Sequence, residues 1–217
     1  MNALLRALVV LMALSPLACS AADGAKFKFG EHYLRVRAAV APANPDKIEV
    51  AEVFAYSCPH CYTLEPALQK WVKKLPADVE FVQLPHTLGR PTGALQNKAF
   101  YAARMLGVLD KFHPALFGAI HARHKAMGTV EEIRALFVES TGVKAEDFDG
   151  AFGGFAVDAG FRRGETAIQA MAISSVPTLV VNGQYFTSGG MAPGGLKGML
   201  EVADFLIEQA RQERGKR

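Results

Sequence analysis

The chain has 217 residues, enough for a single domain or for one domain that carries an insertion. Half of its residues are hydrophobic and 21% are charged, which is typical of a globular protein. The formal net charge of +3 argues against nucleic-acid binding, and the absence of long lysine or arginine runs argues against a charged tail or a polybasic membrane patch.

Residues 1–22 have the layout of a secretory signal peptide. One arginine lies near the start, an apolar stretch extends from Leu4 to Leu14, and small residues follow Pro16. The apolar stretch is shorter than the roughly 20 residues that span a bilayer, so we expect cleavage and export. Cys19 lies in this segment and could instead be an acylated lipoprotein cysteine. A lipoprotein signal usually has leucine where Pro16 stands, however, which favours removal of Cys19 with the signal peptide.

The first part of the mature chain predicts a strand–helix–strand unit. One strand is expected within residues 26–40, and a turn rich in Pro, Asn and Asp precedes a nearly continuous apolar run at 48–56, which is typical of a buried strand. A helix begins at Cys58 and ends at Pro76, and another strand covers 79–84. This order predicts that the strands at 48–56 and 79–84 are parallel and joined by a right-handed crossover.

The second part of the chain predicts helices, a hairpin and a closing helix. Between about residues 93 and 163, short helical patterns follow one another without a strand signal, and 165–173 predicts a further helix. Residues 177–186 predict a β-hairpin whose two-residue turn is the Asn-Gly dipeptide at 182–183. An amphipathic helix from residue 194 ends the chain.

The tetrapeptide Cys58-Pro59-His60-Cys61 lies where the buried strand meets the helix. Pro59 suits the first helical turn, where a missing N–H is harmless. The helix N-terminus presents unpaired N–H groups and a partial positive charge to Cys58, and His60 adds a donor, so we expect Cys58 to be the reactive thiolate. Cys61 lies one turn further along and is expected to be the resolving thiol. Strong stabilisation of the Cys58 thiolate would favour the reduced form and make the disulfide an oxidant.

The sequence admits two other interpretations of this cysteine pair. Zinc usually needs four ligands and a second Cys or His pair, and the sequence shows no such pair near Cys58 and Cys61. A structural disulfide is typical of small secreted scaffolds with several cysteines, whereas only these two remain after Cys19 is removed. A redox-active pair without a metal or other cofactor is therefore the preferred interpretation.

Pro177 is a second candidate site residue. It directly precedes a predicted strand and lies far from the cysteines in sequence. A cis proline can open an edge strand, and Val176 would then offer its backbone N–H and C=O groups to an extended substrate segment. A trans proline in a loop is the alternative from the sequence alone.

Together these features resemble the DsbA family of bacterial periplasmic thiol oxidases. The resemblance covers nearly the whole mature chain and rests on the CPHC tetrapeptide, the following YTLEP, the helical block, SSVPTLVVNGQY and the closing helix. It implies an α/β thioredoxin fold formed by residues 23–92 and 164–217, with a helical insertion at 93–163. It also implies that Pro177 is cis and faces the cysteines.

The resemblance further implies a function, a location and partners. The Cys58–Cys61 disulfide would be donated to reduced, unfolded exported proteins in the periplasm, and a DsbB-type membrane quinone reductase would reoxidise the protein, which is expected to be a monomer. A reductase or isomerase on the same fold is the first alternative, although the extra dimerisation domain of isomerases is not visible. A non-enzymatic metal-binding module is an alternative from a different class.

Glu52 is a further site residue implied by the resemblance. It stands six residues before Cys58, and the matching glutamate of the family lies beneath the cysteines and assists proton transfer at the resolving thiol. Gln83 stands about where some members carry a lysine partner, so burial without a cation would raise the pKa of Glu52. A solvated position at the end of the strand is the alternative.

Three histidines and several aromatic residues complete the sequence-based expectations. His121 and His124, with His113 upstream, could form a metal site, but a solvated helix face is the preferred interpretation. The sequence assigns four aromatic residues to the core or to a groove: Phe54, Tyr56, Trp71 and Phe81.

Overall fold

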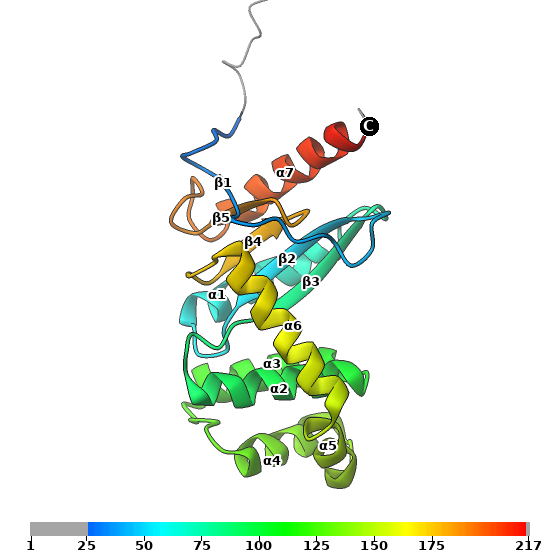
Figure 1. Ribbon diagram of the computed structural model, residues 1–217. Coiled ribbons are helices and arrows are strands. Elements are labelled where there is room, and N and C mark those ends of the chain that lie inside the picture. The colour runs from blue at the N-terminus through cyan, green and yellow to red at the C-terminus, as the bar shows by residue number, and fades with distance from the viewer. Residues whose placement is uncertain (1–25, 216–217) are drawn as a thin grey trace, which may run out of the picture.

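A computed structural model describes residues 26–215, which form one mixed five-stranded sheet and seven helices. In Figure 1 the helix α7 lies above the sheet, the helices α2–α5 gather at the opposite end of the molecule, and α6 runs between these two regions. The signal peptide predicted at 1–22 and Cys19 lie outside the described residues. Within residues 26–215, no helix is both long and apolar enough to cross a membrane.

The strands follow the order β1-β5-β4-β2-β3 across the sheet. β2 and β3 are parallel, as predicted, whereas β4 is antiparallel to both β2 and β5, and β1 is antiparallel to β5. The bounds are β1 Leu34–Arg35, β2 Ile48–Phe54, β3 Val79–Pro85, β4 Thr178–Val181 and β5 Tyr185–Ser188.

The helices confirm most of the expected order. Their bounds are α1 Pro59–Val72, α2 Pro91–Met105, α3 Leu109–His121, α4 Val130–Thr141, α5 Ala145–Phe152, α6 Phe155–Met171 and α7 Gly198–Arg214. The separate helix expected at 165–173 is the end of α6, and the division placed at 163/164 falls inside this helix. Gly160 and Gly164 do not break α6, because their missing side chains leave room for the ring of Tyr101 on α2.

Two other local expectations need correction. The strand expected within residues 26–40 is reduced to Leu34–Arg35, which lies at the edge of the sheet and pairs only with β5 among the described strands. The hairpin turn is one residue longer than predicted, since Val181 pairs with Tyr185. The Asn-Gly dipeptide at 182–183 does adopt the expected left-handed backbone, with φ of 51° and 61°.

The alternation of side chains along β2 decides what lies on each face of the sheet. Ile48 and Val50 pack with α1 and α7, whereas Ala51 and Val53 pack with α6. Glu52 shares the parity of Ile48 and Val50 and therefore points to the face that α1 covers. Both cysteines belong to the hydrophobic cluster that also includes the insertion helices, so the end of α1 lies at the junction of the sheet and the insertion.

Candidate active site

Cys58 caps the N-terminus of α1. Its backbone is extended, with φ of −89° and ψ of 116°, and Pro59 occupies the first helical turn as predicted. The side chain of Cys58 is only 9% exposed. A hydrogen bond from the Cys61 thiol lowers the pKa of Cys58 to about 6, and the backbone N–H groups of Cys61 and His60 act in the same direction against the opposing effect of burial. This setting favours a thiolate at neutral pH.

His60 contributes less than its position in the tetrapeptide suggested. Its side chain is exposed, and its charge is the smallest of the causes that lower the pKa of Cys58. The backbone N–H of His60 contributes more than its ring does. The thiol of Cys61 and the end of the helix are thus the main source of stabilisation.

Cys61 has the opposite character. It is fully buried, and its hydrogen bond to Cys58, together with burial, raises its pKa. Both cysteines are free thiols in this structure. The pair therefore holds one sulfur that ionises readily and one that retains its proton, which are the properties of an attacking or leaving thiol and a resolving thiol.

The Val176–Pro177 peptide bond is cis and faces the cysteines, which confirms the prediction. Cys58 Sγ lies 3.5 Å from the carbonyl oxygen of Val176, to which the sulfur donates a hydrogen bond only when it is protonated. Pro177 directly precedes β4, which pairs with β2. The strand order thus brings residues 118 positions apart to one site.

Glu52 lies buried on β2 with 1% of its surface exposed, so the solvated alternative is wrong. It is paired in register with Gln83 on β3, whose Nε2 donates a hydrogen bond to Glu52 Oε2 over 2.9 Å. Burial and the charge of Glu65 raise the pKa of Glu52 to about 8, and the hydrogen bond from Gln83 only partly opposes this rise. An amide is therefore the hydrogen-bond partner of Glu52.

The comparisons with known proteins agree with this site. Residues 93–201 match the family described as DSBA-like thioredoxin domain. The thiol:disulfide interchange protein DsbA of Pseudomonas aeruginosa is 38% identical over 210 residues, which cover 97% of each chain. The corresponding protein of Azotobacter vinelandii is 40% identical over 187 residues, or 86% of each chain. The crystal structure of Pseudomonas aeruginosa DsbA has a TM-score of 0.81 and 37% identity, and the match covers 87% of this chain and 97% of that chain.

The chain belongs to the DsbA family. The predicted thioredoxin fold with inserted helices is confirmed, and the protein is a thiol:disulfide oxidoreductase. Within residues 26–215, no group of three or more His, Cys, Asp or Glu side chains is placed to hold a metal ion.

In this DsbA-family protein, the prediction of a solvated histidine face on α3 is wrong for His113 and only partly right for His121, which is half-buried. His113 is only 4% exposed, and the ring of His121 stacks on Tyr62 with centroids 4.9 Å apart. Only His124, which lies beyond the end of α3, is exposed. His113, Phe117 and His121 recur every four residues, a spacing that could have identified one face of the helix.

The buried face of α3 places His113 beside Glu52. His113 Nδ1 lies 2.8 Å from the Tyr56 hydroxyl, and its Nε2 lies 3.2 Å from Gln83 Nε2 and 3.4 Å from Glu65 Oε1. Sequence reasoning assigned Tyr56 to the core or a groove but did not connect it or His113 with the site. The insertion thus supplies a polar group to the region beneath the cysteines.

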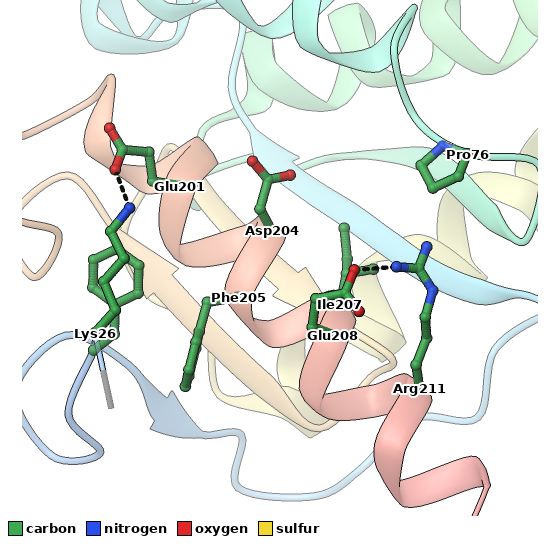
Figure 2. A pocket seen from close by; sticks show the side chains of 9 residues that line it. Lys26, Pro76, Glu201, Asp204, Phe205, Ile207, Glu208 and Arg211 are labelled. Atoms are coloured by element: carbon green, nitrogen blue, oxygen red, sulfur yellow. Dashed lines mark hydrogen bonds and ion pairs between the residues drawn. The ribbon is translucent and has the colours of Figure 1, made fainter. Parts of the chain in front are cut away.

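Two hollows differ in their relation to the site. One of about 860 Å³ between α1, β3 and α3 is lined by Glu65, Gln83 and His113, together with apolar side chains such as Phe81. The other, of about 490 Å³, lies beside α7 and has ion pairs at its rim, including Lys26 with Glu201 (Figure 2). Its lining includes none of the predicted site residues, so only the first hollow adjoins the polar groups near the cysteines.

Proposed function

We propose that this protein is a periplasmic thiol:disulfide oxidase that donates its Cys58–Cys61 disulfide to newly exported, reduced proteins. A DsbB-type membrane quinone reductase would reoxidise it, and it would act as a monomer. The observation that carries the proposal is that the pKa values of the two thiols are shifted in opposite directions. The pKa of Cys58 is lowered to about 6, and that of Cys61 is raised.

The reaction would begin when a substrate thiolate attacks Cys58 Sγ of the disulfide form. The Cys58–Cys61 bond breaks, Cys61 leaves with the electron pair and takes up a proton, and a mixed disulfide joins the substrate to Cys58. A second substrate thiolate then attacks the substrate sulfur, and Cys58 leaves as a thiolate. The backbone of Val176 would hold the substrate segment, because its carbonyl group already lies 3.5 Å from Cys58 Sγ.

The peptide complex of a relative supports this view of substrate binding. The DsbA of Proteus mirabilis was crystallised with the non-covalently bound peptide PWATCDS, and that chain is 27% identical to this one with a TM-score of 0.72. We extend peptide binding to this protein, with extended and cysteine-containing segments of unfolded chains as its substrates.

The lowered pKa of Cys58 gives the direction of the redox preference. With a pKa of about 6, the thiolate is favoured about tenfold at pH 7. This ratio corresponds to about 1.4 kcal/mol, or about 30 mV towards an oxidising potential, before solvent screening reduces it. An isomerase or reductase would not require such stabilisation of the reduced form.

The test is the reduction potential of the mature protein, measured by equilibration with glutathione buffers of known ratio. Reference values are about −270 mV for thioredoxin and about −120 mV for DsbA, the family to which this chain belongs. A value clearly above −270 mV and towards −120 mV, together with disulfide transfer to a reduced unfolded protein, supports the oxidase. A value near that of thioredoxin would instead indicate a reductase.

A further inference from the structure

A chain of hydrogen-bonding groups connects the helical insertion with the buried carboxyl group of Glu52. Gln83 Nε2 donates to Glu52 Oε2 over 2.9 Å and also lies 3.2 Å from His113 Nε2. The other ring nitrogen of His113 lies 2.8 Å from the hydroxyl of Tyr56. Glu52, Tyr56 and His113 are each less than 5% exposed, whereas Gln83 is partly buried and lines the hollow between α1, β3 and α3.

The hydrogen-bonding capacities of these groups determine where the protons lie when Glu52 is ionised. A carboxylate only accepts, so the NH₂ side of the Gln83 amide must face Glu52. The same nitrogen has only a proton to offer to His113, so Nε2 of His113 must accept it and cannot also donate to Glu65 Oε1, which lies 3.4 Å away. The proton of the neutral imidazole then lies on Nδ1 and is donated to the oxygen of Tyr56.

We propose that His113 is a positioning residue for Glu52: by accepting one amide proton of Gln83, it keeps the other amide proton directed at the Glu52 carboxylate. The inference rests on the proposed function for the redox step that uses Glu52. It assigns to the insertion a direct part in the environment of the resolving cysteine. It also assigns to a neutral amide–imidazole pair the place that a lysine takes in some family members.

The packing around His113 makes it suitable for this role. Its ring is surrounded by aromatic rings, with centroid distances of 5.2 Å to Phe54, 4.9 Å to Phe117 and 6.1 Å to Phe100. These rings fix the plane of the imidazole, and the hydroxyl of Tyr56, which can donate or accept, pairs with its other ring nitrogen. The amide of Gln83 therefore meets an acceptor at a fixed position.

Several ionisable groups face this network and act on Glu52. Cys58, Cys61 and Glu65 come from α1, Tyr56 comes from the segment before α1, and His113 comes from α3. The charge of Glu65 opposes ionisation of Glu52. Since the other neighbours of Glu52 add no positive charge, the amide of Gln83 is the principal group that stabilises its carboxylate, and His113 determines how that amide is turned.

The network has a defined task in the redox step. When Cys61 leaves the disulfide with the electron pair, it needs a proton, which the Glu52 carboxyl group supplies, so Glu52 becomes a carboxylate. The N–H of Gln83 then stabilises the new charge. During reoxidation the Cys61 thiol returns its proton to Glu52 as it attacks the mixed disulfide at Cys58. No proton passes through Gln83.

The test is the pH titration of Glu52 in the reduced mature protein, followed by the infrared band of its protonated carboxyl group. The Glu52→Gln variant identifies the band. In His113→Phe, a ring still fills the aromatic surroundings but accepts no proton. We expect the titration midpoint of Glu52 to rise by about one pH unit, a tenfold gain in proton affinity, because the hydrogen bond to the carboxylate weakens.

Two matched substitutions separate positioning from packing. The side-chain oxygen of His113→Gln can take the place of Nε2 and should restore the wild-type midpoint, whereas that of His113→Asn reaches only the Nδ1 place and should not. In a Gln83→Leu background, which already lacks the amide, His113→Phe should cause no further rise. The Gln and Asn variants also decide the matter if the Phe variant does not fold.

The outcomes distinguish this inference from the proposed function. An unchanged midpoint in His113→Phe, or an equal rise with and without the Gln83 amide, would overturn the positioning role whatever the reduction potential is. Conversely, a reduction potential near that of thioredoxin would refute the proposed oxidase function. The shift of the Glu52 titration midpoint in His113→Phe would still be expected. The carboxyl titration needs neither substrate nor membrane partner.

Discussion

Replacement of Glu52 by Gln should stabilise the reduced protein, and the gain should depend on pH. The pKa of Glu52 rises from 4.5 to about 8 on folding, so the folded state binds the proton more tightly than the unfolded state does. Stability is therefore fully present below pH 4.5 and falls as the pH rises towards 8. pH 7 lies about 2.5 pH units above the pKa of the carboxyl group in the unfolded state. At about 1.4 kcal/mol per pH unit, the free energy of unfolding at pH 7 is therefore lower by roughly 3 kcal/mol than in acid.

Urea unfolding of the reduced wild type and of Glu52→Gln between pH 4.5 and pH 8 measures this loss. Because Cys58 titrates in both proteins, its contribution largely cancels in the difference. We expect the variant to be more stable by up to about 3 kcal/mol at pH 7 and about equal at the acidic end. Glu49→Gln is the matched control, since Glu49 lies on the same strand but is only partly buried, and should give a smaller gain. A stability difference that does not change with pH would refute the reasoning.

Two further predictions concern the cysteine pair and the hairpin. Cys61→Ala should raise the pKa of Cys58 more than His60→Ala does, since the Cys61 thiol is the largest cause of the lowered pKa and the charge of His60 the smallest; thiolate absorbance against pH measures both. Gly183→Ala should lower stability by at least about 2 kcal/mol in chemical unfolding. The reason is that its φ is +61° and its new Cβ would lie 1.7 Å from the carbonyl oxygen of Val40.

The local parts of the site were predictable from the sequence. A cysteine followed by proline at the start of a helix has its position fixed by neighbours in the chain, so Cys58 and Pro59 lie where the pattern indicated. The parallel pairing of β2 and β3 followed from the strand–helix–strand order. Pro177 could be placed near the cysteines only because the tetrapeptide and the Val-Pro-Thr segment together resembled a known family.

The parts that failed depend on contacts between distant segments. Helical spacing alone does not say which face of α3 is covered, so His113 was assigned to solvent although α1 and β3 bury it. The sequence predicted a separate helix at 165–173, and the packing of Gly164 against Tyr101 within the continuous α6 could not be foreseen from it. Likewise, the sequence of residues 26–40 does not show that only Leu34 and Arg35 pair with β5.

The pairing of Glu52 with the neutral side chain of Gln83, rather than with a lysine, has a consequence for the charge of the whole site. An ionised glutamate paired with a lysine has no net charge, and a glutamate with a pKa of about 8 is also mostly neutral at pH 7. Both arrangements therefore avoid a net negative charge beneath the Cys58 thiolate, which would oppose its ionisation. The two arrangements differ in alkaline solution, because here Glu52 ionises above pH 8 without a cation nearby. The stabilisation of the Cys58 thiolate should then weaken in this protein, whereas a lysine-containing relative would retain it until the lysine itself loses its proton.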